Sequence, residues 1–223
     1  MSDPIDSLPA PAQHFRWIPI RSLSVRHRSR VLSHLMTLEA HDRYLRFGYG
    51  ATDAQIARYV DTLDFERDEL FGIFNRKLEL IAMAHLAYLP RTAAASHAAE
   101  FGVSVVPKAR GRGLGSRLFD HAVLHARNSN VDTMIIHALT ENTAMLKIAH
   151  QAGASVVRDG SDAEARLRLP PYTVASQIEA LVEDRAAEFD YHLKRQARRM
   201  DSLLGMLGEV RSGIEKTRAS RPE

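Results

Sequence analysis

The sequence predicts a mixed α/β (α+β) domain that is followed by an amphipathic helical extension. Short apolar runs alternate with segments of helical period up to residue 170, and a glycine-rich turn at 103–115 joins a strand directly to a helix. Beyond that point apolar residues recur every three or four positions. We therefore expect a disordered N-terminus at 1–13, one domain at 14–170 and a helical extension at 171–223.

The first third of the chain predicts one strand and two helices. Residues 15–21 alternate well enough for a strand, although Pro19 suits only a sheet edge or a strand end. Apolar side chains occur at helical spacing over 28–38. Asp53 is a plausible N-cap for a second helix that extends to about Leu63.

The middle and last thirds predict more strands, with two helices between them. Residues 70–75 and 80–88 form two apolar runs around a polar turn, which favours an antiparallel hairpin, and the alanine-rich segment 92–98 is expected to be a loop. The remaining expected elements are a strand at 99–106, a helix at 114–126, a strand at 134–138, a helix at 141–152 and two strands at 155–157 and 165–169.

Composition restricts the possible partners and chemistry. The 30 basic and 27 acidic residues leave a net charge of only +3, so we do not expect nucleic acid as a partner. The chain has no cysteine, which excludes disulfides, thiolate metal sites and a cysteine nucleophile. We recognise neither a signal peptide nor an apolar run long enough to span a membrane, and we expect a cytoplasmic protein with no membrane partner.

The turn from strand to helix is the strongest functional signal. Gly111, Gly113 and Gly115 stand at alternate positions, where glycine permits left-handed backbone and the close approach of a ligand. The free N–H groups of the following helix and its dipole favour an anion such as a pyrophosphate. Arg110 and Arg112 would add positive charge.

Other readings of this turn remain open. A structural turn without a ligand would also explain the glycines. The dinucleotide fingerprint requires G-x-G-x-x-G, whereas this turn reads G-x-G-x-G, and a Walker loop lacks its Gly-Lys-Ser/Thr here.

The stretch Arg110-x-x-Gly113-x-Gly115 after a strand that ends Val103-Ser-Val105 resembles the coenzyme A signature of the GNAT N-acetyltransferase family. The order of elements over about residues 15–169 resembles that family as well. The resemblance implies the GNAT acyl-CoA N-acyltransferase fold, acetyl-CoA as co-substrate without a metal, and transfer of the acetyl group to an amine.

The resemblance also implies cofactor contacts. Backbone groups of Val103, Ser104 and Val105 would pair with the pantetheine arm, the amide at about Val105 would stabilise the oxyanion, and Asn142 would approach the cofactor from a later helix. Asn142 could equally be a polar residue of the helix's first turn. The amides implied to hold the pyrophosphate belong to Arg110, Gly111, Arg112, Gly113, Leu114, Gly115 and Ser116.

Glu100 is the candidate general base. It lies in an Ala-Glu-Phe stretch ten residues before Arg110, and this stretch resembles the protein-lysine acetyltransferases of the family. A partly buried carboxylate at that place could have its pKa raised towards neutrality. The alternative is an ordinary exposed glutamate at a strand start.

The general acid is less defined. Many family members have a tyrosine seven residues after the helix asparagine, where this chain has Ala149. The adjacent His150 could reach the same space or be a solvated helix histidine, and water or the acceptor amine could serve instead. His121 and His125 have a spacing that metal ligands use, but we interpret them as a solvated helix face and predict no metal.

The resemblance also implies that the segment between the first two helices, at 39–48, helps to shape the acceptor pocket. Its Arg43-Tyr-Leu-Arg-Phe47 stretch resembles domains that acetylate lysines on metabolic enzymes. Arg43 and Arg46 would suit an acidic acceptor, or they could be surface pairs. A small amine remains an alternative acceptor, and a catalytically inactive acetyl-CoA-binding regulatory module remains an alternative function.

The C-terminal extension predicts an interaction. Over 173–218 an apolar stripe repeats for about ten turns, with Gly205 and Gly208 as a point where it could divide into two helices. We expect this stripe to be buried against the catalytic domain or in a homodimer.

Overall fold

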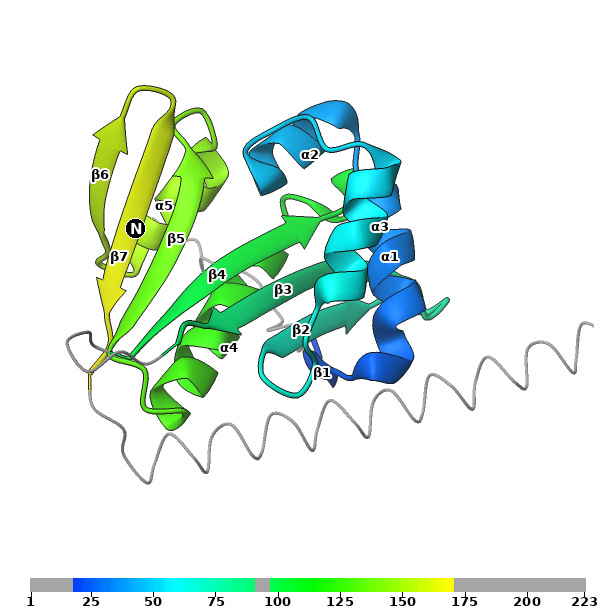
Figure 1. The fold of residues 1–223 in the computed structure, drawn as a ribbon, viewed down its shortest axis with the longest axis horizontal. Coiled ribbons are helices and arrows are strands. Elements are labelled where there is room, and N and C mark those ends of the chain that lie inside the picture. The colour runs from blue at the N-terminus through cyan, green and yellow to red at the C-terminus, as the bar shows by residue number, and fades with distance from the viewer. Residues whose placement is uncertain (1–17, 91–96, 171–223) are drawn as a thin grey trace, which may run out of the picture.

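A computed structural model of the chain describes residues 18–90 and 97–170. The predicted N-terminal disorder at 1–13, most of the loop at 92–98 and the C-terminal helix with its dimer contact fall outside these residues. The described part forms one mixed sheet with helices on both faces (Figure 1). The predicted mixed α/β class is therefore confirmed.

The sheet has seven strands in the order β1-β2-β3-β4-β5-β7-β6. All neighbouring pairs are antiparallel except β4 and β5, which are parallel. The strands are β1 (Arg21–Leu23), β2 (Glu69–Phe74), β3 (Leu80–Tyr88), β4 (Ala98–Val105), β5 (Thr133–Leu139), β6 (Ser155–Asp159) and β7 (Asp162–Arg168).

Two apolar cores lie on the two faces of this sheet. Helices α1 and α3 cover one face of the β1–β3 end, and α4 and α5 lie on the opposite face (Figure 1). The helices are α1 (Arg28–Met36), α2 (Ala40–Phe47), α3 (Asp53–Thr62), α4 (Leu114–Asn128) and α5 (Thr143–Gln151). In the described part of the chain no helix is long and apolar enough to cross a bilayer.

Two N-terminal predictions are corrected. The first strand begins at Arg21, because Pro19 has no N–H to offer the ladder and precedes the strand. Thr52, not Asp53, caps α3, and its side chain accepts a hydrogen bond from the amide of Gln55 while Gln55 reaches back. Asp53 is the first residue inside the helix, where a carboxylate also favours the dipole.

The segment between the first two predicted helices is itself a helix. α2 spans Ala40–Phe47, and Asp42 is its one buried residue. Phe47 packs against the core formed by α1 and α3, and polar contacts of Asp42 and Arg43 also hold α2 over the sheet.

Candidate functional site

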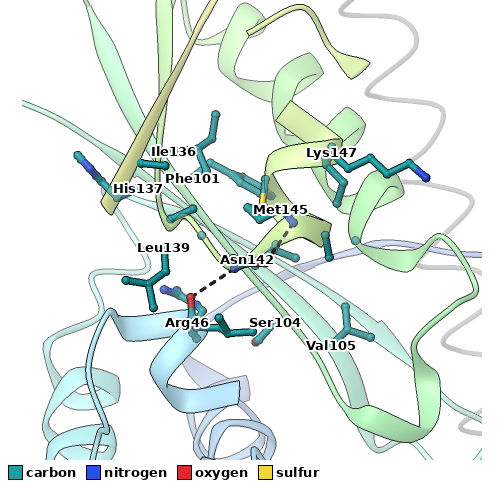
Figure 2. A pocket seen from close by; sticks show the side chains of 18 of the residues that line it. Arg46, Phe101, Ser104, Val105, Ile136, His137, Leu139, Asn142, Met145 and Lys147 are labelled. Carbon is teal, nitrogen blue, oxygen red and sulfur yellow. Dashed lines mark hydrogen bonds between the residues drawn. The ribbon is translucent and has the colours of Figure 1, made fainter. Parts of the chain in front are cut away.

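A cavity of about 1250 Å³ opens between β4, β5 and three helices. Its walls come from α2, from the N-terminus of α4 and from α5 (Figure 2). It contains most of the residues that the sequence singled out, namely Glu100, Val103, Ser104, Val105, Arg110, Gly111, Gly113, Leu114, Gly115, Ser116 and Asn142. Arg112 and His150 are exposed and are not among the lining residues.

The cavity exists because β4 and β5 separate. The two parallel strands pair only at 98–100 with 133–135, and after Glu100 they diverge (Figure 1). Residues 101–105 remain paired with β3 on the other side. The strand edge of Val103 and Val105 that faces β5 therefore offers backbone groups to the cavity.

The turn from β4 to α4 has the geometry that its glycines predict. Gly111 and Gly113 have φ values of 72° and 70°, where a side chain would strain the backbone. Gly113 is the N-cap of α4 and provides no side-chain cap. The amides of the first helical turn therefore lack intrahelical partners and, with the helix dipole, form an anion-binding end.

One arginine of this turn, Arg110, contributes less charge than the sequence suggests. Arg110 Nη2 lies 2.5 Å from Asp42 Oδ1 on α2, and Arg110 Nε donates to the Val105 carbonyl at 3.2 Å. Asp42 is buried, and its charge offsets that of Arg110. The ion pair therefore reduces what Arg110 contributes to the attraction for an anion, to which the backbone groups of the turn and the exposed Arg112 still contribute.

Asn142 is the N-cap of α5. Its Oδ1 accepts a hydrogen bond from the Met145 amide at 3.1 Å, and its Nδ2 lies 3.5 Å from the Leu45 carbonyl of α2 (Figure 2). Asn142 thus joins α5 to α2 at the cavity, in addition to its capping role.

Glu100 lines the cavity, but it is exposed and not partly buried as expected. Glu100 is paired with Ala87 on β3 and with Ile135 on β5, and it is the last residue at which β4 and β5 are paired. The carboxylate therefore stands where the cavity begins, with access to solvent.

The Ser104 hydroxyl donates a hydrogen bond to a buried histidine, His34. His34 Nδ1 lies 2.8 Å from the Leu80 carbonyl, which can only accept, so Nδ1 carries the proton. His34 Nε2, 2.8 Å from Ser104 Oγ, is then the acceptor. Burial, with a smaller contribution from Arg46, lowers the pKa of His34 to about 4, so this arrangement holds at neutral pH.

Arg46 ends a second hydrogen-bonded chain. Arg46 Nη2 donates to the Tyr59 hydroxyl at 3.1 Å, Tyr59 contacts His85 Nδ1 at 2.9 Å, and His85 Nε2 lies 3.0 Å from Asp68 Oδ2. Arg67 closes the chain with two hydrogen bonds to Asp68. We call Arg46, Tyr59, His85 and Asp68 the arginine relay.

The protonation of the relay follows from its chemistry. Burial lowers the pKa of His85 even though Asp68 opposes this, so the imidazole is neutral at pH 7. Burial acts to raise the pKa of Asp68, but hydrogen bonds from Arg67 and His85 outweigh it and hold the pKa below its usual value. Asp68 is thus an anion that accepts from His85, and the Tyr59 hydroxyl donates to His85.

Sequence reasoning missed this relay, apart from Arg46. Tyr59 falls within the second predicted helix, and nothing in the sequence marks Tyr59, His85 or Asp68 as functional. They come from α3, β3 and the loop before β2, so no local spacing connects them. The weak signal was polar residues inside or beside apolar strands, where a buried polar group needs a partner.

Arg43 does not line the cavity and so is not placed to contact an acetyl acceptor. Its guanidinium donates to the carbonyls of Met36, Leu38 and Ala51 and forms an ion pair with Asp53 at 2.6 Å. These contacts cap the end of α1 and attach α2 to α3, so Arg43 is structural.

The position of the family's usual tyrosine is closed to the cavity. Ala149 is fully buried in the core, and His150 lies on the exposed face of α5. The structure therefore does not bring His150 to the cavity.

The prediction of a solvated face for His121 and His125 is wrong. His121 is 3% exposed, and both rings pack against Phe71 at centroid distances of 4.6 and 4.7 Å. His125 Nδ1 lies 2.6 Å from Glu69 Oε2. Within residues 18–90 and 97–170 no cluster of three or more ligand-type side chains could hold a metal ion.

Solved structures show the same fold. The GNAT domain of S. lividans PAT superposes with a TM-score of 0.57 at 22% identity, covering 67% of this chain and 89% of that domain. A GNAT-family acetyltransferase from Streptococcus pneumoniae has a TM-score of 0.55 at 13% identity and covers 69% of this chain and 100% of its own. For an N-acetyltransferase from Staphylococcus aureus Mu50 the TM-score is 0.53 at 14% identity, with 68% and 98% covered.

Sequence comparison extends this result. No curated protein sequence is similar enough to count as a match. The sequence profile of the Acetyltransferase (GNAT) family, however, matches residues 34–154, more than half of the chain, including the β4–α4 turn and Asn142. The chain therefore belongs to the GNAT acetyltransferase family.

Proposed function

We propose that this protein transfers the acetyl group of acetyl-CoA directly to an amine, with Glu100 as the general base. The observation that carries the proposal is the convergence in one cavity of the anion-binding end of α4, the open edge of β4 and the Glu100 carboxylate. Family membership supports acetyl-CoA as the donor.

The residues present fit acetyl-CoA. The amides at 114–116, which follow the two glycines of positive φ, suit a pyrophosphate. The edge of Val103 and Val105 that faces β5, where the Val105 carbonyl also accepts from Arg110, suits the amide groups of a pantetheine arm. Asn142 lines the same cavity. When bound, acetyl-CoA supplies an activated thioester; the protein supplies the binding groups and the base.

The transfer step balances without another reactant. The ammonium proton of the acceptor passes to Glu100, directly or through water, and the free nitrogen attacks the thioester carbon. A C–N bond forms as the C–S bond breaks, and the thiolate takes a proton from water or from the acceptor nitrogen. The strand amide at about Val105 would stabilise the oxygen on which charge develops.

A peptide lysine is the acceptor that we propose. Its support is the sequence of α2, Arg43-Tyr-Leu-Arg-Phe47, together with the Ala99-Glu-Phe101 context of the base, both of which resemble protein-lysine acetyltransferases. The cavity also has room for a small amine, so both acceptor types belong in the test.

The test compares wild type with Glu100→Gln and a matched control, Glu66→Gln. Glu66 is exposed and lies outside the cavity lining. We expect Glu100→Gln to lower kcat roughly 100-fold or more while acetyl-CoA affinity, measured by calorimetry, stays unchanged. Acetyl-CoA binding with no turnover on lysine peptides or small amines would instead support the regulatory module.

A further inference from the structure

The guanidinium of Arg46 lies over Gly102, on the face of β4 that carries the side chains of Glu100 and Ser104. A Cβ placed on Gly102 would lie 2.7–2.9 Å from three guanidinium atoms of Arg46. Glu100, Gly102 and Ser104 alternate along one face of β4, so Gly102 stands between the candidate base and Ser104. The glycine makes room for the arginine at this place.

Several contacts fix Arg46 there. The Tyr59 hydroxyl accepts from Nη2, and the rings of Phe47 and Tyr59 lie 5.3 and 5.7 Å from the guanidinium carbon. Tyr59 is held in turn by His85 and Asp68. A long, flexible side chain is thus preorganised through the arginine relay, which reduces the entropy lost when it binds a ligand.

Arg46 differs from the other arginines of the site in its partners. Of the other arginines that line the cavity, Arg110 pairs with Asp42 and Arg166 pairs with Glu164. In the described part of the chain the contacts of the Arg46 guanidinium are Tyr59, the two rings and the Gly102 backbone, and none of these is a carboxylate. A guanidinium has five N–H donors, so Arg46 offers positive charge and donors to the cavity that it lines.

The geometry points to Arg46 as the specificity residue for an acceptor that carries a carboxylate near its reacting amine. This inference rests on the proposed function and narrows its substrate class to a lysine with an acidic side chain beside it. A planar guanidinium suits a carboxylate because two parallel N–H···O bonds can form.

The spacing of the strand sets the distance between the two acceptor groups. Glu100 and Gly102 are two residues apart on β4, which corresponds to about 7 Å. An amine at Glu100 and a carboxylate at Arg46 would therefore be separated by about that distance, which the side chains of adjacent Lys and Asp residues can span.

Two pairs of acceptors test this inference. The peptide pair differs only in Asp or Asn beside a single lysine, and the small-molecule pair is 4-aminobutanoate and 1-aminobutane. For each pair, turnover with acetyl-CoA and binding to the CoA-loaded protein are measured for wild type, Arg46→Gln, Tyr59→Phe and Arg76→Gln. Arg76 is an exposed arginine in the β2–β3 turn, outside the cavity lining, and controls for the loss of one positive charge.

We expect wild type and Arg76→Gln to prefer the Asp peptide, with a KM roughly tenfold or more below that of the Asn peptide. Arg46→Gln should remove this preference, so that the Asp and Asn peptides are acetylated with similar KM values. Tyr59→Phe keeps the ring and loses the hydroxyl, so the preference should fall only several-fold. A preference for 4-aminobutanoate alone would assign the carboxylate to a small molecule and overturn the peptide inference.

Equal binding of the two members of both pairs to wild type would overturn the inference, and so would a preference that survives Arg46→Gln. The proposed function fails in a different way. If the Asp peptide binds preferentially through Arg46 and no acceptor is acetylated, the carboxylate site stands and the transferase is excluded.

Discussion

Two walls of the cavity use different kinds of chemical group. One, which we call the loop wall, comprises residues 110–116 and the β5-facing edge of β4, and it offers backbone amides and carbonyls. The other, the relay wall, comprises α2, Tyr59 and the face of β4 that carries Glu100, Gly102 and Ser104. It offers side chains that other side chains hold in place.

The difference matches the two ligands that we propose. A pyrophosphate and a pantetheine arm are the same in every reaction of acetyl-CoA, and backbone groups at a helix N-terminus bind them without requiring particular side chains. An acceptor varies from one enzyme to another, and side chains such as Arg46 can change without altering the backbone. We infer that the loop wall determines the donor and the relay wall determines the acceptor.

The strongest way to break this comparison is Gly113→Asp. Gly113 has φ = 70°, and an aspartate there would strain the backbone and place a negative charge at the anion-binding end of α4. We expect acetyl-CoA binding to be lost in calorimetry. Gly160→Asp is the matched control, because Gly160 has φ = 57° in the β6–β7 turn and does not line the cavity. Normal acetyl-CoA binding by Gly113→Asp would refute the loop wall as the donor site.

The second prediction uses His34, the buried histidine of α1 that accepts a hydrogen bond from Ser104 on the relay wall. The folded-state pKa of His34, about 4, lies below its usual value of 6.5, so the unfolded chain takes up the proton first as the pH falls. Stability is therefore present above about pH 6.5 and is lost as the pH falls towards 4. From pH 7 to pH 5 this amounts to about 2 kcal/mol.

Urea unfolding of wild type and His34→Gln at several pH values measures this loss. Gln can still occupy the site between Leu80 and Ser104 but does not titrate, so its stability should fall less between pH 7 and pH 5. Identical pH slopes for the two proteins would show that His34 is not buried in its neutral form.

The sequence predicted the two walls unequally, and the reason is their composition. The loop wall is contiguous: the glycines, the end of β4 and the start of α4 lie within 14 residues, where spacing alone carries the signal. Even there, the ion pair of Arg110 with Asp42 was not predictable, because it joins two elements that are far apart in the sequence.

The relay wall is assembled from distant segments. Tyr59 and His85 are 26 residues apart, and Asp68 lies 17 residues from His85, so only the register of the sheet and the packing of α3 bring them together. Arg43 and Arg46 look equivalent in the sequence, yet one caps α1 and the other lies on Gly102. Their separation depends on the helical form of α2, whereas the sequence predicts only a segment between two helices.

A third prediction tests the contact between Arg46 and β4. In Gly102→Ala the added Cβ would displace the guanidinium, which can move at small cost because it ends a flexible side chain. The KM for the Asp peptide should rise about tenfold, as one charge-assisted contact is lost, while acetyl-CoA affinity and the unfolding free energy change little. If the KM stays at the wild-type value, Arg46 does not act from this position.

The last and smallest effect concerns Asp42, which joins the two walls. Asp42 lies on α2 and its carboxylate pairs with Arg110 of the glycine loop, so its negative charge stands beside the proposed pyrophosphate site. Asp42→Asn keeps an oxygen for Arg110 and removes the charge. At roughly 6 Å and a dielectric constant between that of water and 20, one charge contributes about 0.7–3 kcal/mol to an anion's binding, and the weakened hold on Arg110 offsets part of this. We therefore expect acetyl-CoA to bind about threefold to tenfold more tightly at low salt, with the difference shrinking as salt is added.

Calorimetry of acetyl-CoA binding to Asp42→Asn and wild type at two salt concentrations measures both the gain in affinity and its salt dependence, and a urea titration confirms that the variant is folded. Unchanged or weaker binding by a folded variant would mean that the Asp42–Arg110 pair does not oppose the donor, and the two walls would then be coupled through backbone contacts such as Asn142 with Leu45.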